Sequence, residues 1–341
     1  MNSLTRKLFY CVFLLFYLAN KLDAVLNKLM TDDNAIDFDR YLRYEEIIDH
    51  LNKVASRHKS VAKIEDFGVS HENRRLVLIK IASATRKIKP LIFIEAGIHA
   101  REWLAPAQAI YIINQLLEVS ENKELRDKVD WVIIPLLNPD GYEYSHSVDR
   151  LWRKNRAKGK LCDGVDLNRN FDFHWSQTGA SNYECSSTYA GVKAFSEPES
   201  FALSMTIKKY ASRTKLYLSL HTAEQCILFP WGYTLDSAKN DQELRHLAYV
   251  VSSKVFNISK TEYRIGTSAQ ILNVVSGSSR DWAYGIANIS LAFTIELEAF
   301  LHPRHVDRFI MPPNRIFKVV SEMFEGIKVF YAFIRDKYCV H

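Results

Sequence analysis

Apolar residues recur along the chain with two different periods, and segments of the two periods alternate. Spacing of three to four residues predicts helices over 44–58, 106–119, 196–211, 240–255 and from Pro313 to Ile334. Short apolar or alternating runs bounded by turn residues predict strands over 75–82, 91–96, 130–137, 215–221, 226–230 and 291–296. Strands that alternate with helices indicate an α/β fold with a largely parallel or mixed sheet. The chain has no internal repeat and no linker-like change in composition, so we expect a single domain.

Two polar segments interrupt this pattern. The sequence NPDG (138–141) is a strong turn signal, and a long irregular stretch follows over 142–195. Loops of this length inside a compact domain are usually functional. Ser196 and Glu199, with Pro198 between them, form a capping-box pattern that predicts the start of the helix ending near residue 211.

The N-terminus has the layout of a secretory signal peptide. Two basic residues precede an apolar run from Leu8 to Ala19, which is too short to span a bilayer as a helix. We predict a signal peptide over 1–24, with Ala19 as the alternative cleavage position, and an extended lead-in over 25–36. No other apolar run is long enough for a membrane helix, and the C-terminus has no hydrophobic tail for a lipid anchor. We therefore expect a secreted, extracellular protein with no membrane span.

The net charge says little about partners. It is +6 for the whole chain, and it falls to +4 (6 − 3 + 1) when three basic residues and one acidic residue leave with the signal peptide. The densest basic stretch runs from Arg150 to Lys160 and carries no nucleic-acid motif. We interpret it as a solvated loop, and we expect no nucleic-acid partner and a monomeric protein.

Four cysteines remain after the signal peptide. Cys162 and Cys185 lie 23 residues apart and flank a polar, loop-like segment, so we expect a disulfide between them in an oxidising compartment. Cys226 lies in an apolar strand-like run that is typical of a buried thiol, and we expect Cys339 to be free. Two positions match the N-x-S sequon for glycosylation: Asn257 and Asn288.

The candidate chemistry begins where the strand over 91–96 ends. Gly97 breaks this apolar run, and His99 and Glu102 follow three residues apart. An imidazole and a carboxylate at this spacing can reach one ion, and nitrogen and oxygen ligands together suit zinc. A catalytic zinc needs a third protein ligand, and His221 is the best candidate because it also ends a predicted strand. For the His–Glu pair alone, ordinary polar turn residues remain the alternative.

Seven segments carry a resemblance that extends from about Asp37 to Ile334. They are GIHAREW (97–103), NPDGYEYSHS (138–147), RLWRKNR (150–156), CDGVDLNRNFD (162–172), LSLH (218–221), SRDW (279–282) and FTIELE (293–298). In this order they resemble the zinc metallocarboxypeptidases of the pancreatic carboxypeptidase A and B type. The resemblance implies one catalytic domain over 37–341, with a mixed, mostly parallel eight-stranded sheet and helices on both faces. It also implies a peptide hydrolase that removes single C-terminal residues, so the expected partners are the C-termini of peptides or proteins.

The resemblance implies a metal centre with one Zn2+ per chain. His99, Glu102 and His221 resemble the three zinc ligands. Asp166 resembles the carboxylate that hydrogen-bonds the first ligand histidine, which fixes the tautomer of the ring and raises its basicity. The disulfide between Cys162 and Cys185 also matches the family pattern.

The resemblance further implies the catalytic and substrate-binding groups. Glu296 resembles the general base that takes a proton from the attacking water and passes it to the leaving amine. Arg153 resembles the cation that polarises the scissile carbonyl and stabilises its oxyanion. Asn168 and Arg169 resemble the pair that holds the terminal carboxylate of the substrate, with the guanidinium making a two-pronged contact.

The sequence also departs from the family pattern. Asn273 stands where the family has a mobile substrate-binding tyrosine, and we expect weaker substrate binding rather than lost chemistry. Thr222 to Glu224 differ from the usual Ser-Tyr after the ligand histidine, which changes the subsite upstream of the cut bond. One extra residue lies between Trp282 and Glu296, and Glu298-Ala299 replaces an Arg-Asp pair.

Arg280 stands where this family sets its preference for the C-terminal side chain. An apolar residue there favours apolar side chains, and an acidic residue favours Lys and Arg. We therefore expect Arg280 to favour C-terminal Glu or Asp, as the corresponding residue does in carboxypeptidase O. The alternative is that a local carboxylate, such as that of Glu224 or Glu298, pairs with Arg280 and leaves a different pocket. Glu224 also forms a second H-x-x-E pattern with His221, which we interpret as coincidental.

Two hypotheses follow for the function. The first is an active secreted zinc carboxypeptidase; about a dozen residues separate the predicted signal peptide from the first matching segment, so we expect no inhibitory pro-segment. The second is a catalytically weak homologue that acts as a secreted zinc- or peptide-binding protein, which Asn273 and the altered 222–224 segment suggest.

Overall fold

The computed structural model describes residue 36 and residues 38–83, 88–300 and 308–339. The chain divides into two units, residues 1–38 and 39–341, and the description below concerns the second unit. The predicted signal peptide, and the predicted lead-in up to residue 35, lie outside the described residues.

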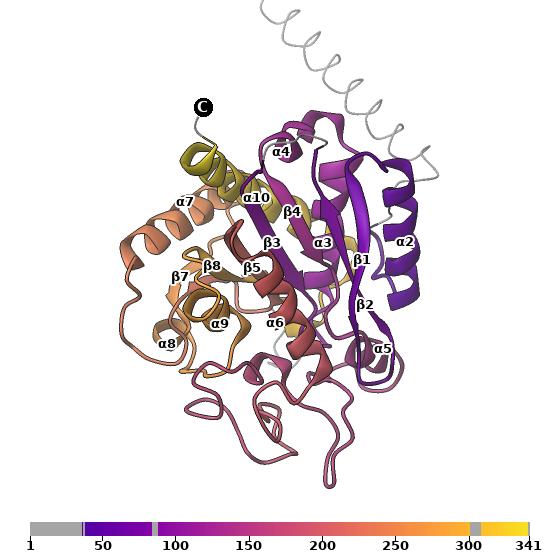
Figure 1. The fold of residues 1–341 in the computed structure, drawn as a ribbon, viewed down its shortest axis with the longest axis vertical. Helices are drawn as coiled ribbons and strands as arrows, with labels where there is room; N and C mark the ends of the chain where they lie inside the picture. The colour runs from indigo at the N-terminus through magenta and orange to yellow at the C-terminus, as the bar shows by residue number, and fades with distance from the viewer. Residues whose placement is uncertain (1–35, 37, 84–87, 301–307, 340–341) are drawn as a thin grey trace, which may run out of the picture. The chain divides into compact units, whose positions relative to one another are not determined.

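An eight-stranded mixed sheet runs through the described part of this unit (Figure 1), as predicted. The strands are β1 (Ala62–Val69), β2 (Arg75–Ile81), β3 (Leu91–Ala96), β4 (Asp130–Ile134), β5 (Thr214–Thr222), β6 (Cys226–Phe229), β7 (Arg264–Thr267) and β8 (Ala292–Leu297). Their order in the sheet is β1-β2-β4-β3-β5-β8-β6-β7. The four central strands β4, β3, β5 and β8 are parallel, so their carboxyl ends lie at one edge of the sheet.

Helices cover both faces of the sheet, as predicted. They are α2 (Tyr44–Arg57), α3 (Leu104–Leu117), α4 (Glu124–Asp127), α5 (Pro139–Ser147), α6 (Pro198–Tyr210), α7 (Asp241–Ser259), α8 (Ser268–Ile271), α9 (Ser279–Gly285) and α10 (Ile316–Tyr338). Figure 1 shows α6 and α9 in front of the sheet and α3 and α10 behind it. One core cluster joins Leu203 of α6 and Trp282 of α9 to Phe93 of β3 and Tyr217 of β5. The central strands are buried on both sides for this reason.

The strong periodic segments were predicted correctly, whereas the weak ones were missed. All six predicted strands and all five long helices are present, within a few residues of their expected bounds. The edge strands β1 and β7 were not predicted, because β1 carries Lys63, Glu65 and Asp66 and β7 has only four residues. The short helices α4, α5, α8 and α9 were not predicted, and α5 lies where a turn and an irregular stretch were expected.

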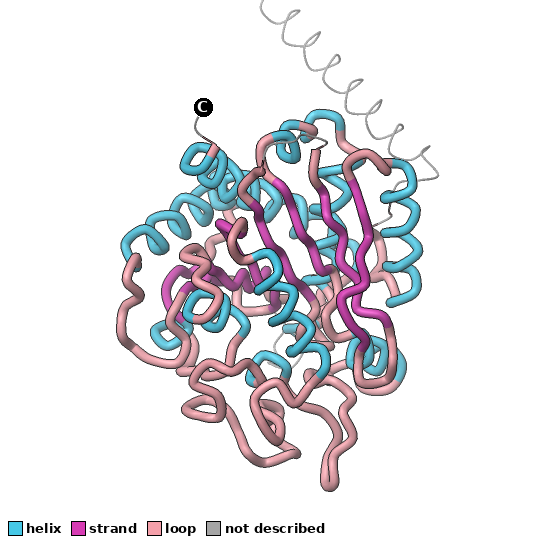
Figure 2. Tube along the Cα trace, viewed as in Figure 1, coloured by secondary structure: helices cyan, strands magenta, loops and turns pink. Residues whose placement is uncertain are grey.

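A long irregular segment connects α5 to α6, as the polar composition predicted. Figure 2 shows it mainly as loop, drawn in pink below the sheet. The Cys162–Cys185 disulfide is present within it. Cys226 is a buried free thiol, as expected, and Cys339 is also free. The sequon residues Asn257 and Asn288 are both exposed.

The predicted capping box at the start of α6 is wrong in its details. The N-cap residue is Glu197, with Pro198 as the first helical residue and no side-chain cap. The hydroxyl of Ser196 donates instead to Glu197. Glu199 turns away from the helix end because the backbone N–H of His71 donates to its Oε1 at 2.9 Å and Asn155 donates to its Oε2 at 3.2 Å. Glu199 therefore ties α6 to the loop before β2 and to the long irregular segment.

Burial makes Glu199 a source of pH-dependent stability. Its side chain is fully buried, and burial raises its pKa from 4.5 to about 7. The folded protein therefore binds a proton that the unfolded chain releases, so Glu199 makes folding less favourable as the pH rises from about 4.5 to 7. The full effect is about 3 kcal/mol of unfolding free energy.

We predict that Glu199→Gln flattens this part of the stability profile. The difference in unfolding free energy between the variant and the wild type should grow in favour of the variant, by up to about 3 kcal/mol, as the pH rises from about 4.5 to 7. Denaturant unfolding at several pH values measures it. Parallel profiles for the two proteins would show that Glu199 titrates normally.

Candidate active site

The site forms where three parallel strands end. Beyond β3 the chain turns at Gly97, which has a φ of 67° and sits so close to Leu136 that a Cβ would lie 2.6 Å from its Cδ1 atom. Only glycine meets both conditions, and the turn delivers His99 and Glu102. His221 lies near the end of β5, where it is the register partner of Glu296 on β8. Residues more than 100 positions apart in the sequence therefore meet at one edge of the sheet.

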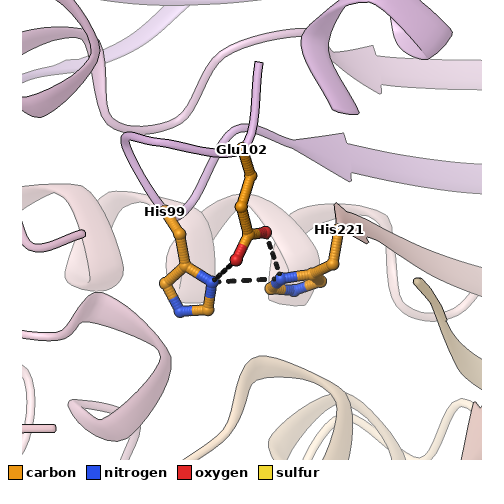
Figure 3. A group of neighbouring side chains, drawn as sticks. All are labelled: His99, Glu102 and His221. Carbon is orange, nitrogen blue, oxygen red and sulfur yellow. Dashed lines mark hydrogen bonds and ion pairs between the residues drawn. The ribbon is translucent and has the colours of Figure 1, made fainter. Parts of the chain in front are cut away.

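His99, Glu102 and His221 converge as the sequence predicted (Figure 3). All three are buried, and their ligand atoms lie within 4.8 Å of one another. Nδ1 of His99 lies 2.8 Å from Oε1 of Glu102, and Nδ1 of His221 lies 2.9 Å from Oε2 of the same carboxylate and 3.2 Å from Nδ1 of His99. Two imidazole nitrogens and a carboxylate that face one point are a donor set that fits zinc.

The electrostatics of these groups follow from burial and mutual proximity. Burial alone would raise the pKa of Glu102, but His99 and His221 hold it well below its usual range. Burial would lower the pKa of His221, but Glu102 raises it to about 9. The pKa of His99 is lowered, first by burial and then by Arg153. Glu102 is therefore ionised and lies between the two rings, where its negative charge favours binding of a cation.

Asp166 contacts the ring nitrogen of His99 that faces away from Glu102, as the resemblance implied, and it also binds Arg153. Its Oδ1 lies 3.2 Å from Nε2 of His99, and its Oδ2 accepts from Nε and Nη2 of Arg153 at 3.0 and 2.8 Å. Burial opposes ionisation of Asp166, but Arg153, Arg169 and His99 together lower its pKa well below the usual range. This one carboxylate therefore fixes both a ring of the metal centre and the guanidinium beside it.

Arg169 and Asn168 lie next to Asp166: Nη1 of Arg169 is 3.8 Å from its Oδ2, and the backbone N–H of Asn168 donates to its Oδ1 at 3.0 Å. Nε of Arg169 donates to the carbonyl of Gly179 and Nη1 donates to the carbonyl of Asn168, both at 2.9 Å. The side-chain oxygen of Asn168 accepts from the backbone N–H of Ser279 at 2.9 Å, which leaves its amide nitrogen as the free end. Burial lowers the pKa of Arg169, and the nearby guanidiniums of Arg153 and Arg280 lower it further. A concentration of positive charge of this kind attracts anionic groups.

Arg280 is paired, but not with either of the carboxylates considered from the sequence. Its Nε and Nη2 donate to Oδ1 of Asp281 at 3.1 and 3.0 Å, and its Nη1 donates to Ser268 at 2.9 Å. Glu224 instead pairs with Arg308 and Arg264, and Glu298 pairs with Arg315 and Lys318. The alternative, that a local carboxylate pairs with Arg280, is therefore confirmed in kind, but the carboxylate belongs to Asp281, the next residue in α9. Glu224 is also outside the group of metal-binding side chains, as expected.

Glu296 lies beside His221 without joining the metal-binding group, and Asn273 is also outside that group. Glu296 is partly exposed, but its Oε2 is buried and has no hydrogen-bond partner among the described residues. Burial raises its pKa from 4.5 to about 7, with opposing effects of His221 and Glu102. Asn273 is exposed and follows α8, two residues beyond its end.

Two charged residues near the centre were missed from the sequence. Arg101, between the two ligands of the first motif, stacks on Phe309 at 4.0 Å, and burial lowers its pKa to about 10. Glu95 lies within β3, and its signal was a carboxylate inside the otherwise apolar run from Leu91 to Ala96. A charged residue in a fully buried strand needs a partner, and that rule would have marked it.

Comparisons with known proteins agree with this geometry. A family model described as "Zinc carboxypeptidase" matches residues 47–326. The chain is 38% identical over 307 residues to carboxypeptidase B of Astacus astacus, covering 89% of this chain and 100% of that protein. It is 32% identical over 330 residues to carboxypeptidase O of Bos taurus, covering 94% and 87%. The crystal structure of carboxypeptidase A from Helicoverpa armigera matches with a TM-score of 0.83 and 31% identity, over 93% of this chain and 80% of that one.

The chain therefore belongs to the zinc carboxypeptidase family. It is a metallocarboxypeptidase, a peptide hydrolase whose substrates are the C-termini of peptides, and His99, Glu102 and His221 are placed so that they could hold a metal ion. No helix in the described ranges combines the length and apolar character needed to cross a membrane.

Proposed function

We propose that this protein is a secreted carboxypeptidase that binds one Zn2+ and removes single C-terminal Glu or Asp residues. The observation that carries the specificity is the buried guanidinium of Arg280, which is only 2% exposed and lies near enough to Arg169 to lower the pKa of that residue. A substrate that ends in Glu or Asp brings two carboxylates to the site, and two sets of cationic donors are available for them. The secretory layout of residues 1–24 supports the proposed location.

Pairing with Asp281 is compatible with this role for Arg280. A guanidinium has five N–H groups, and the contacts to Asp281 and Ser268 use three of them (5 − 3 = 2 remain). Oδ2 of Asp281 is itself held by the backbone N–H groups of Gly232 and Tyr233. The pair is therefore a rigid unit that compensates the buried charge and still offers donors to a second carboxylate.

The terminal carboxylate of the substrate has its own anchor in this proposal. Arg169 supplies the charge and Asn168 supplies the amide N–H groups that its bond from Ser279 leaves free. The contacts of Arg169 with Gly179 and of Asn168 with Ser279 hold both side chains before substrate arrives. An anchor fixed in this way restricts cleavage to the last peptide bond of the chain.

The remaining roles follow from position and charge. Zinc bound by the three ligands supplies a Lewis acid that acidifies water and polarises the peptide carbonyl. Glu296, opposite His221, has a pKa of about 7 and is suited to accept a proton near neutral pH and return it to the leaving amine. Arg153, held by Asp166, directs a fixed positive charge to where the oxyanion develops.

The specificity test compares kcat/KM on matched peptides that end in Glu, Phe and Lys. We predict the highest value for Glu, complete sensitivity to a chelator, and a loss of about 10- to 100-fold on the Glu peptide in Arg280→Met, because a hydrogen bond to a charged group contributes about 1.5–3 kcal/mol. Methionine has similar length without charge, so activity on Phe should persist or rise.

Ser268→Ala is the matched control, since it removes one contact of Arg280 and keeps the charge; its loss on the Glu peptide should be smaller. A wild type most active on Phe or Lys would refute the acidic preference and leave the zinc chemistry intact. Bound zinc without turnover of any peptide would support the second hypothesis, a zinc- or peptide-binding protein.

We predict that Glu296→Gln lowers kcat by about 10²- to 10⁴-fold, the usual contribution of a general acid–base group. Zinc content should stay unchanged, because Glu296 lies outside the group of ligand residues. Steady-state kinetics and metal analysis of the same preparation check both expectations. Loss of zinc in the variant, or an unchanged kcat, would assign the base to another residue.

We predict that Asn273→Tyr lowers KM by about threefold to tenfold and changes kcat little, because an added aromatic contact is worth about 0.5–1.5 kcal/mol. Its exposed position leaves room for the larger side chain. Kinetics on the Glu peptide decide the point: a large gain in kcat would mean that Asn273 limits the chemistry as well as the binding.

A further inference from the structure

Glu95 is a buried carboxylate to which none of the proposed roles applies. Its side chain is 0% exposed. Its Oε1 accepts hydrogen bonds from the hydroxyls of Tyr217 (3.2 Å), Ser219 and Ser279 (3.4 Å), whereas its Oε2 has no partner among the described residues. Removing a carboxylate from water costs several kcal/mol, so a buried strand would be more stable with an apolar residue here. The position needs another explanation.

One side chain, that of Ser219, connects Glu95 to the predicted metal ligand His221. It is the register partner of Ser219 on the neighbouring parallel strand β5. Tyr217, Ser219 and His221 lie at alternate positions of β5 and therefore project from the same face of the sheet. The hydroxyl oxygen of Ser219 lies 2.9 Å from Nε2 of His221. The opposite ring nitrogen, Nδ1, is the one that faces Glu102 and His99.

The hydrogen positions in the series Glu95–Ser219–His221 follow from the acceptor at its end, Oε1 of Glu95. Burial raises the pKa of Glu95, but three hydroxyls converge on its Oε1 and none on its Oε2. A proton on the carboxyl would therefore sit on Oε2, and Oε1 accepts the single proton of the Ser219 hydroxyl in either state. The hydroxyl oxygen is then an acceptor toward His221, and Nε2 of the ring must be the protonated nitrogen. When a metal binds, Nδ1 would therefore be the nitrogen that gives up its proton, and its lone pair would face the position between the ligands. The carboxyl of Glu95 therefore sets the direction of the bond between Ser219 and His221.

We propose that Glu95 is a positioning residue for the zinc centre, and that it acts through Ser219 to hold His221 in the tautomer that presents Nδ1 to the metal. Asp166 contacts the ring of His99 directly, whereas Glu95 acts on the ring of His221 through the hydroxyl of Ser219. Outer carboxylates of this kind fix ring orientation and ligand basicity. The inference rests on the zinc site and does not depend on the proposed preference for acidic residues.

The test measures the zinc dissociation constant of metal-free protein by competition with a chromophoric chelator. Glu95→Met removes the acceptor at similar size, and we expect zinc affinity to fall by about 10- to 100-fold. Ser219→Ala should have an effect of the same size. The double variant should be no weaker than the single ones by more than about threefold, because both break the same chain of bonds.

Glu95→Gln is the conservative variant, and we expect it to retain the zinc affinity that Glu95→Met loses. Its side-chain oxygen can occupy the place of Oε1 and accept from Ser219, so its zinc affinity should stay within about threefold of the wild type. Asp130→Asn is the matched control: Asp130 is also buried, but it begins β4 at the opposite end of the parallel strands from the site. It should leave zinc affinity unchanged even where it lowers the stability of the metal-free protein.

Several outcomes would overturn the proposal. An unchanged affinity in Glu95→Met or Ser219→Ala would do so, as would effects of the two substitutions that multiply. An equal loss of zinc affinity in Asp130→Asn would show that the effect of Glu95→Met comes from a general loss of stability. If Glu95→Met does not fold, Ser219→Ala and Glu95→Gln decide the question by the same expectations. A wild type that binds zinc tightly but shows no preference for Glu peptides would count against the proposed specificity alone.

Discussion

The parallel register of β3, β5 and β8 is the constraint on which the site depends. Side chains alternate between the two faces of a strand, so a slip of one residue would turn every polar group of the site into the opposite layer. In the observed register Glu95 is opposite Ser219, and His221 is opposite Glu296. The intervening apolar positions of these strands are fully buried and fix the register through packing. The chemistry is therefore positioned by the hydrophobic core beneath it.

Within that register, buried charge is the second constraint. Each carboxylate of the site lies beside a histidine or an arginine: Glu102 between two histidines, Asp166 between His99 and Arg153, and Asp281 beside Arg280. Removing one partner of such a pair leaves the other uncompensated in a medium of low polarity, which costs more than the pair itself contributes. Each functional side chain is consequently held in one orientation before any substrate or metal binds.

The sequence predicted the parts of this arrangement that depend on long periodic segments or on specific motifs. The central strands, the long helices, the disulfide and the convergence of His99, Glu102 and His221 were all expected, because strand ends meet at one edge of a sheet. The partner of Arg280 could not be read from spacing, since Asp281 is adjacent to it and adjacent residues usually point apart. The direction of Glu199 was also hidden, because a tertiary contact with His71 overrides the local capping pattern.

The positions that we propose set specificity differ physically from those that we propose carry the chemistry. His99, His221 and Glu296 extend from strands or from the turn after a strand, so the core restricts their movement. Asn273 and Arg280 lie on or beside the short helices α8 and α9, which the register of the sheet does not control. Ser279 joins the two regions: its hydroxyl donates to Glu95 and its N–H donates to Asn168. Because this is a backbone and hydroxyl connection, the neighbouring pocket side chains can change while the metal centre keeps its geometry.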